Sequence, residues 1–303
     1  MFLKVGIPKG LLYYKYKPFF NTFFEELGAE IIESPDTNKD ILDLGSTLCT
    51  DEACLPIKVF HGHVEKIKDK CDLILIPRIM QIYKREFICP KFCGIPEMIE
   101  NNIEDLPIIT KAPIYLFSSD KFFKWAYETG KILTKNFFKI QKAFERAQNE
   151  QKKFKEGIND KGYALKVALI GHTYNIYDTF INMNVKNKLN KLGVGVITHE
   201  VVDDNVKYLE IKKLFKRPFW TFAREYYGFI SYALKESLID GIVYLSSFAC
   251  GIDSVIVELI KLDFENVPFL LLKIDEHTGE AGFDTRIEAF VDMLSRRKRG
   301  NLA

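Results

Sequence analysis

The sequence predicts an α/β protein made of two doubly wound units, each with a parallel sheet covered by helices on both faces. Short, continuously apolar runs alternate with helical stretches, which is the pattern of strands that are buried on both faces. A second series of such runs follows a long, polar helical stretch in the middle of the chain. A chain of 303 residues also has the usual length for about two domains.

The first unit is predicted from five elements in alternating order. Phenylalanine and leucine recur at helical spacing after Pro18, which suits the first turn of a helix, and Gly28 suits the end of that helix. The last apolar run of this series ends at Pro77. The predicted strands span residues 3–7, 29–34 and 72–77, and the predicted helices span residues 18–27 and 57–68.

The middle of the chain predicts helix from residue 121 to about residue 157. Apolar side chains recur there at intervals of three and four, a polar residue among residues 118–120 can cap the start, and Gly157 can end it. Gly130 lies inside this stretch, where glycine costs up to about 1 kcal/mol relative to alanine. We therefore expect either one long helix with a bend or two helices in tandem.

The second half of the chain repeats the order of the first. Its predicted strands span residues 166–171, 192–196, 240–245 and 268–274. The first three of these echo the three strands of the first half, which indicates two copies of one doubly wound unit. We expect an N-terminal α/β domain at residues 1–118, a helical connector at residues 119–160 and a C-terminal α/β domain at residues 161–303.

Composition and charge exclude several classes of partner. The 43 basic and 41 acidic residues give a net charge of +2, so nothing in the charge favours nucleic acid or an anionic membrane as a partner. The first eight residues are too short an apolar run for a signal peptide, and no apolar run reaches the roughly 18 residues that a membrane span needs. We expect a cytoplasmic protein that binds neither nucleic acid nor membrane.

Three of the six cysteines lie in loops suited to a binding site. Cys54 precedes a predicted helix, Cys89 follows the third strand, and Cys250 lies between a strand and a helix. Loops at the carboxyl ends of parallel strands form the binding crevice of such sheets, and a helix N-terminus favours a thiolate. In a cytosolic chain these cysteines indicate metal ligands more than disulfides. Soft thiolates without close pairs favour an iron–sulfur cluster over structural zinc, and buried free thiols are the competing interpretation.

The other cysteines are weaker candidates. Cys71 immediately precedes a strand, so a role in the core is favoured over ligation. Cys49 and Cys93 lie close to Cys54 and Cys89 in the sequence, where each is either an additional ligand or a buried or incidental thiol.

Several motifs around these cysteines resemble the 2-hydroxyacyl-CoA dehydratase family and its activase-related branch, including its component-D-like iron–sulfur proteins. The similarity begins near residue 3 and continues to about residue 294. The C-terminal motif, with its Thr-Arg-x-Glu-Ala-Phe ending, is similar to the same region of the dehydratase subunits. The motifs that carry the resemblance are residues 5–14, 51–58, 85–92, 248–254 and 275–290.

The resemblance implies two Rossmann- or flavodoxin-like domains that share an oxygen-sensitive [4Fe-4S] cluster. The ligands implied are Cys54, Cys89 and Cys250, whose sulfurs would then lie within roughly 7 Å of one another. It also implies low-potential electrons from an ATP-hydrolysing activator of the actin/Hsp70 type. The chain lacks a phosphate-binding loop, so this activator is expected to be a separate protein. The chain is shorter than typical dehydratase subunits, which weakens the expectation of a full acyl-CoA pocket.

Other polar residues are secondary candidates for the site. His61 and His63 lie two apart on a predicted helix and face different sides, so a shared metal is disfavoured and solvated positions are expected. His277 follows the last strand and is a candidate for proton transfer or for bracing its loop. The neighbouring catalytic candidates are Glu276, Glu280 and Arg286, and the candidates for contacts with the cofactor are Glu52, Lys58, Lys91 and Asp253.

Three of these cofactor candidates have a specific expected role. Lys58 and Lys91 would offset the negative charge of a thiolate-ligated cluster, with solvated side chains as the alternative. Asp253 is expected to cap the helix that follows it.

The sequence leaves three functions open. The favoured one is a redox protein that accepts an electron from an activator and passes it on. The second is a complete reductase or dehydratase acting on an acyl-CoA or a small unsaturated molecule. The third is a non-catalytic binding module stabilised by zinc or thiols. A homodimer is compatible with each of them.

Overall fold

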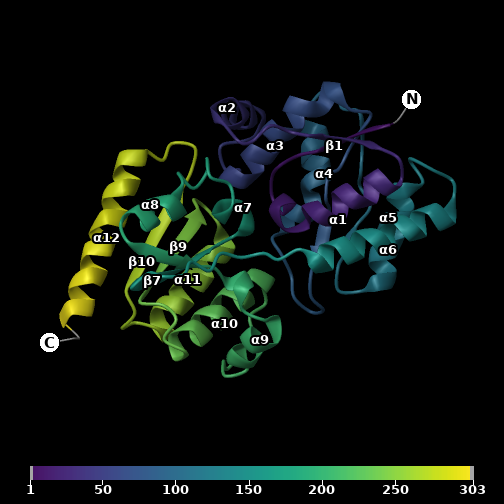
Figure 1. The fold of residues 1–303 in the computed structure, drawn as a ribbon. Coiled ribbons are helices and arrows are strands. Elements are labelled where there is room, and N and C mark those ends of the chain that lie inside the picture. The colour runs from purple at the N-terminus through teal and green to yellow at the C-terminus, as the bar shows by residue number, and fades with distance from the viewer. Residues whose placement is uncertain (1–2, 301–303) are drawn as a thin grey trace. The chain divides into compact units, whose positions relative to one another are not determined.

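The computed structural model describes residues 3–300 and divides the chain into two compact units. The first unit reaches Lys155 and the second begins at Glu156. Each unit contains a four-stranded parallel sheet with helices interleaved between its strands (Figure 1). The predicted fold class, two doubly wound α/β units, is therefore confirmed.

The first unit contains two sheets, and every strand pair in them is parallel. Its main sheet has the order β2-β1-β3-β5, and β4 pairs with β6 in a separate two-stranded sheet. Its elements are β1 (Lys4–Ile7), α1 (Tyr13–Glu26), β2 (Glu30–Glu33), α2 (Lys39–Leu48), α3 (Leu55–Ile67), η1 (Lys68–Lys70), β3 (Leu73–Ile74), β4 (Ile79–Gln81), α4 (Pro90–Asn102), β5 (Ile108–Ile109), β6 (Ile114–Tyr115), α5 (Ser119–Gly130) and α6 (Phe137–Lys153).

The second unit has a parallel sheet with the order β10-β9-β7-β8. Counted within each four-stranded sheet, both sheets have the strand order 2-1-3-4, so the echo in the sequence corresponds to a shared topology. The elements of this unit are β7 (Leu165–Gly171), α7 (Thr173–Ile176), α8 (Val185–Lys191), β8 (Val194–Ile197), η2 (His199–Val201), α9 (Asp204–Ile211), α10 (Thr221–Lys235), β9 (Gly241–Ser247), α11 (Gly251–Asp263), β10 (Phe269–Ile274) and α12 (Glu280–Gly300).

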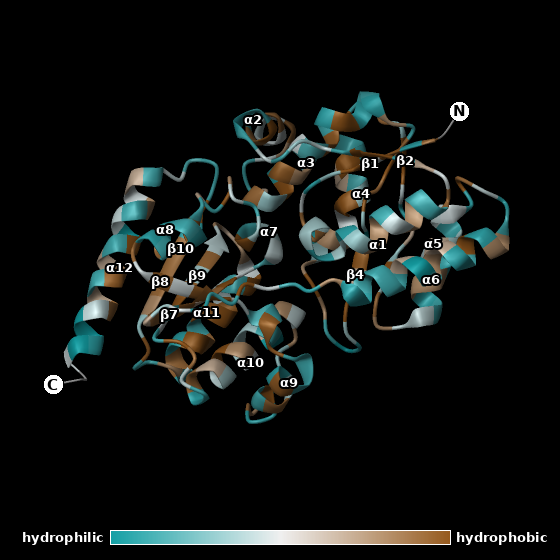
Figure 2. Ribbon diagram, viewed as in Figure 1, coloured by the Kyte–Doolittle hydropathy of each residue, from teal (hydrophilic) through white to brown (hydrophobic). Residues whose placement is uncertain are grey.

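This strand order determines where a ligand is expected to bind. The chain moves outward from the first strand to the second and then returns to place the third strand on the other side of the first. The carboxyl ends of the first and third strands, β1 and β3 in one unit and β7 and β9 in the other, therefore flank a topological switch point. Figure 2 shows that the strands of the second unit are mainly hydrophobic, and every residue of β9 is buried.

An aromatic cluster forms much of the core of the first unit. Helix α1 places Phe19 and Phe23 against Trp125 of α5, and Phe19 also contacts Phe144 of α6. Burying a side chain of this size contributes about 1.5–3 kcal/mol. Helix α1 begins at Tyr13, which contradicts the predicted start near residue 18.

Pro18 consequently lies inside α1 and does not occupy its first turn. A proline there lacks the N–H that would bond the carbonyl one turn earlier. The buried rings on both sides of Pro18 outweigh that loss, because Tyr13 and Tyr16 extend the buried face of the helix towards its start. The helix ends as predicted, with Gly28 at a φ of +88°, a conformation that glycine adopts without strain.

The polar middle stretch forms two helices, α5 and α6, and not one. The Ser118 side chain accepts a hydrogen bond from the backbone of Lys121, and the Asn136 side chain accepts one from Lys139. These caps give each helix its own start. Helix α6 packs along α1, where its Arg146 pairs with Glu26. Among residues 3–300, no helix combines the length and the apolar character that crossing a membrane requires.

Candidate functional site

Cys54, Cys89 and Cys250 occupy equivalent positions in three helices. They are the N-cap residues of α3, α4 and α11, and each helix has 13 residues. All three side chains are partly exposed and none forms a disulfide. A thiol at a helix N-terminus lies beside unpaired backbone N–H groups and the positive end of the helix dipole, both of which favour the thiolate.

Two lysines lie close to Cys54 in the first unit. The Lys91 ammonium donates a hydrogen bond to the Cys54 sulfur over 3.4 Å. Because Lys91 belongs to the first turn of α4, which begins after Cys89, the N-termini of α3 and α4 are neighbours. Lys58 is only 2% exposed, and its ammonium donates to the backbone carbonyl of Asp51 in the loop before Cys54. Glu52, in the same loop, is exposed.

The remaining cysteines differ in their surroundings. Burial raises the pKa of Cys49, at the end of α2, to about 11 although Lys58 opposes it. Burial also raises the pKa of Cys71 to about 11, and its thiol donates to the carbonyl of Ile67. A side chain added at Gly6 would collide with the Cys71 sulfur, so Cys71 fills space beside the sheet. Cys93 is exposed on α4, one turn beyond Cys89.

In the second unit, Cys250 meets two buried side chains, His172 and Asp253. His172 directly follows β7, and Cys250 and Asp253 lie at the start of α11, which follows β9. The His172 Nε2 atom is 3.2 Å from Asp253 Oδ1 and 3.8 Å from Cys250 Sγ. The three ligand atoms all lie within 4.8 Å of one another, at the switch point of this sheet.

Hydroxyl groups fix both buried partners. Tyr226 Oη is 3.1 Å from His172 Nδ1, Tyr244 donates to Asp253 Oδ1 over 2.8 Å, and Ser246 donates to Asp253 Oδ2 over 2.7 Å. Burial alone would lower the pKa of His172, but Asp253 raises it well above its ordinary value. Burial likewise opposes ionisation of Asp253, yet His172 and the hydroxyl donors lower its pKa. Asp253 thus anchors His172, and the prediction that it caps the helix is wrong, because Cys250 is the N-cap residue.

A small pocket lies next to this group. It has a volume of ≈ 180 Å³ and includes Cys250, Asp253, Ser247 and Lys273 in its lining. Ala249, immediately before Cys250, has a φ of +59°, a left-handed conformation that non-glycine residues rarely adopt. Backbone strain of this kind is concentrated at functional sites.

The other predicted catalytic residues lie on the surface. The His277 side chain is 88% exposed, and Glu276 is 3.9 Å from it. Glu280 pairs with Lys188 over 2.6 Å, and Arg286 bonds to the carbonyl of Leu271. The loop itself is braced by Asp275, which accepts hydrogen bonds from the His277 backbone and the Thr278 hydroxyl. These contacts correspond to the loop-bracing alternative and do not bring His277 into the cysteine site.

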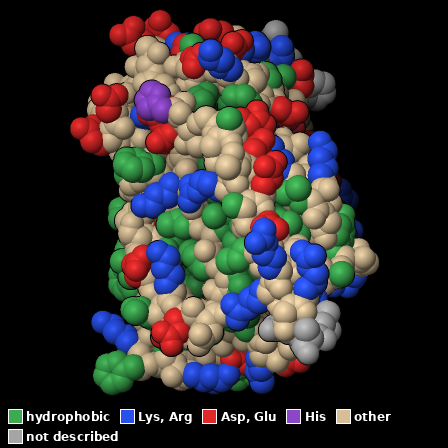
Figure 3. Space-filling view, turned by 90° about the vertical axis from the view of Figure 1, so that its left-hand side faces the viewer, with side chains coloured by type: hydrophobic (Ala, Val, Ile, Leu, Met, Phe, Trp, Pro, Cys, Tyr) green, Lys and Arg blue, Asp and Glu red, His purple; other side chains and the backbone are tan. Residues whose placement is uncertain are grey.

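On the face of the described residues that Figure 3 shows, basic side chains do not form a continuous area. Acidic side chains gather towards one end of that face, and basic side chains are spread among apolar ones over the rest. This distribution agrees with the nearly balanced charge of the chain.

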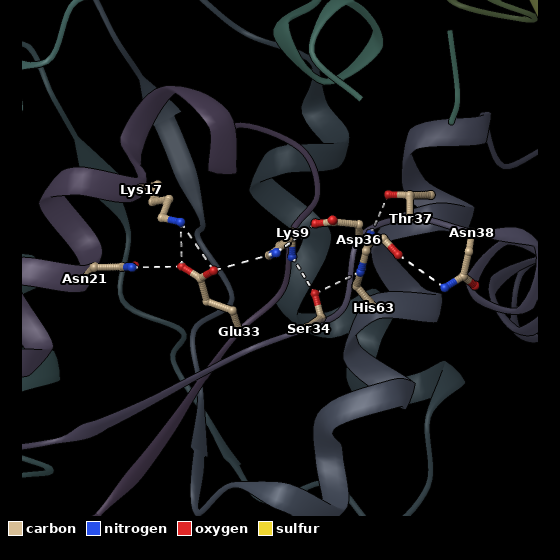
Figure 4. A network of polar contacts seen from close by, with 9 residues as sticks. All are labelled: Lys9, Lys17, Asn21, Glu33, Ser34, Asp36, Thr37, Asn38 and His63. Atoms are coloured by element: carbon tan, nitrogen blue, oxygen red, sulfur yellow. Dashed lines mark hydrogen bonds and ion pairs between the residues drawn. The ribbon is translucent and has the colours of Figure 1, made fainter. Parts of the chain in front are cut away.

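A polar network organises the strand ends of the first unit (Figure 4). The backbone N–H of Lys9, after β1, donates to Ser34, after β2, and the Ser34 hydroxyl is 2.9 Å from His63 Nδ1. Thr37 contacts the other ring nitrogen of His63 over 3.0 Å. Lys9 also pairs with Asp36 over 2.9 Å. The network therefore ties two loops at this edge of the sheet to α3, the helix that begins after Cys54.

The expectation that His61 and His63 are solvated is wrong. Both are 0% exposed, because α3 is buried without interruption from Leu55 to Val64. The two rings do face different partners, since His61 Nδ1 contacts the Ile57 carbonyl and its Nε2 contacts Asn102 of α4. Both histidines are therefore structural residues of the core.

Replacing His63 with glutamine should make the fold less sensitive to acid. Burial, assisted by the Lys9 charge, lowers the pKa of His63 to about 3. His63 takes up a proton near pH 6.5 in the unfolded chain but only near pH 3 in the folded chain. The free energy of unfolding therefore falls as the pH drops from about 6.5 to about 3. The expected loss is about 2 kcal/mol by pH 5. Urea unfolding of the wild type and of His63→Gln at pH 7 and pH 5 measures this loss of stability. Equal losses in the two proteins would contradict the role given to His63.

Two family models match the chain. Residues 4–202 match the CoA enzyme activase uncharacterised domain, and residues 181–294 match the D-component of 2-hydroxyglutaryl-CoA dehydratase. The first match includes Cys54, Cys89 and His172, and the second includes Cys250 and Asp253. No curated protein matches the chain.

Proposed function

Since the chain belongs to the family of the CoA enzyme activase uncharacterised domain and resembles the dehydratase D-component, we propose that it is an iron–sulfur redox protein. It holds a [4Fe-4S] cluster through Cys54, Cys89 and Cys250 and receives low-potential electrons from a separate ATP-hydrolysing activator. The observation that carries the proposal is the shared position of the three cysteines, each partly exposed at a helix N-terminus.

The donor set fits such a cluster. Thiolates are the usual ligands of iron–sulfur clusters, and three of them leave one iron free for another ligand. The ammonium of Lys91 beside Cys54, with Lys58 buried in the same region, supplies positive charge where an anionic cluster needs it. A [4Fe-4S] cluster bound there would supply one-electron transfer at low potential. Convergence of the three sulfurs within roughly 7 Å remains the geometric prediction of this proposal.

The protein's own residues would have distinct tasks. The helix N-termini place the three thiols beside unpaired backbone N–H groups, and Lys91 holds the Cys54 sulfur through a charge-assisted hydrogen bond. Asp253 orients His172, whose Nε2 faces the Cys250 sulfur. We further propose a cytoplasmic location and an activator of the actin/Hsp70 type, in line with the activase-related family.

A second candidate function is catalysis on a small substrate. The pocket of ≈ 180 Å³ beside Cys250 favours it, because its serine hydroxyls and Lys273 could bind a polar molecule close to the cysteine. Turnover of small unsaturated substrates or acyl-CoA thioesters would separate a complete reductase or dehydratase from a protein that only transfers electrons.

Anaerobic purification tests the proposed function directly. The protein should be brown and should contain about four iron and four sulfide ions per chain, with an electron paramagnetic resonance signal after one-electron reduction. Mixing with the ATP-hydrolysing activator should make that reduction depend on ATP. A colourless protein that takes up no iron when supplied with iron and sulfide would refute the proposal.

A further inference from the structure

We propose that His172, Cys250 and Asp253 form a mononuclear site for a divalent transition-metal ion, with Zn²⁺ as the ion that best suits these donors. All three ligands belong to the second unit. The site needs neither Cys54 nor Cys89 and goes beyond the proposed cluster. Because the Cys250 sulfur cannot ligate the cluster and the single ion at the same time, the ion binds to a chain that carries no cluster.

The distances from His172 Nε2 to the other two donor atoms fit one tetrahedral ion, and all three donor atoms lie within 4.8 Å of one another. Zinc bonds of about 2.0–2.1 Å to nitrogen and oxygen and about 2.3 Å to sulfur place nitrogen and oxygen about 3.3 Å apart and nitrogen and sulfur about 3.6 Å apart. The corresponding separations are 3.2 Å from His172 Nε2 to Asp253 Oδ1 and 3.8 Å from Nε2 to Cys250 Sγ. The chain thus holds the donors near coordinating geometry.

The same distances argue against a nucleophilic cysteine triad. In such a triad the acidic residue binds Nδ1 of the histidine, while Nε2 faces the nucleophile. Here the carboxylate and the sulfur both approach Nε2, and Nδ1 faces the hydroxyl of Tyr226. Because the Asp253 oxygen and the Cys250 sulfur both approach Nε2, all three atoms surround one point where a metal ion could bind. A proton relay would not need this arrangement.

The surroundings supply the outer partners that metal ligands commonly have. A ligating histidine usually makes a hydrogen bond through its other ring nitrogen, and a ligating carboxylate is itself hydrogen-bonded. Tyr226 provides the first contact, and Tyr244 and Ser246 provide the second. The rings of Phe222 and Tyr174 lie 4.7 and 5.1 Å from the His172 ring and fix its orientation.

The pocket provides access and a fourth ligand position. His172 and Asp253 are only 2% and 1% exposed, but Cys250 and Asp253 line the pocket of ≈ 180 Å³. Three protein ligands and an open side are the pattern of catalytic zinc sites, whereas structural sites close with four. The open position would take water or a small ligand with an oxygen donor.

Cobalt binding to the full-length Cys54→Ser/Cys89→Ser variant tests the site. This double variant lacks two of the three proposed cluster ligands but keeps the whole mononuclear site. Anaerobic titration with Co²⁺ should show one equivalent bound, with the thiolate-to-cobalt absorption in the near ultraviolet. Adding Cys250→Ser should abolish that absorption, and adding Ser246→Ala should weaken binding by roughly 10–100-fold, the usual cost of losing an outer partner. Asp292→Asn, which alters a surface carboxylate paired with Arg296, should change nothing.

A second measurement avoids changes to buried residues. Zn²⁺ should protect Cys250 of the double variant from alkylation, as read by mass spectrometry, while exposed Cys93 continues to react. Unprotected Cys250, or cobalt absorption that survives Cys250→Ser, would overturn the proposal. Iron uptake by the wild-type chain tests the cluster separately, so the two ideas can fail independently.

Discussion

Replacing Cys54, Cys89 or Cys250 with serine should each remove most of the iron from anaerobically purified protein. Serine keeps the size of the side chain but offers a hard oxygen in place of a soft thiolate, which iron–sulfur clusters require. Each of the three is the N-cap residue of its helix, where serine is also an accepted residue, so the helices should keep their starts. Iron and sulfide analysis with electron paramagnetic resonance measures the effect.

Cys71→Ser is the matched control for this series. Burial raises the pKa of Cys71 and its thiol already donates to the carbonyl of Ile67, an interaction that serine can retain. Its iron content should therefore stay close to that of the wild type. Full iron in all three N-cap variants would contradict the ligand assignment and leave the thiols as ordinary cysteines.

Most strands of the two main sheets could be predicted from the sequence because they form mainly apolar runs between helices. β7, β9 and β10 appear as mainly apolar runs, and β9 is buried at every residue. Helix α2 was not predicted, although Ile41, Leu44 and Leu48 recur in it at helical spacing; its only buried residues are Ile41 and Gly45. Its stability comes from packing against α3, which no local pattern reveals.

The residues of the cysteine site could be predicted only in part, because some of their contacts depend on how the strands pair. Cys54 and Cys250 stood out because each precedes a helix pattern after a loop. His172 was missed, since a single histidine after a strand has no partner within its own segment. Its contacts with Cys250 and Asp253 depend on β7 lying beside β9. The available signal was its position directly after the first strand of a doubly wound unit, where ligand-binding loops lie.

Helices α2 and α3 approach each other through two glycines. A Cβ atom built on Gly45 would lie 1.7 Å from the backbone oxygen of Lys58, and one built on Gly62 would lie 1.9 Å from the backbone oxygen of Ile41. Both obstacles are backbone atoms, so no side-chain rotation can relieve the overlap. The position of α3, and with it that of Cys54 and Lys58, depends on these two residues having no side chain.

Gly45→Ala should therefore lower the free energy of unfolding by about 3 kcal/mol or more, at or beyond the upper end of the usual cost of overpacking. It should also lower the iron content, because α3 must move away and carry Cys54 with it. Gly94→Ala in α4 is the matched control, since a Cβ there meets nothing within 4 Å. That control should be neutral or stabilising by up to about 1 kcal/mol, because alanine favours helix over glycine. Urea unfolding followed by circular dichroism measures both variants, and similar midpoints for the two would show that α2 and α3 can separate without cost.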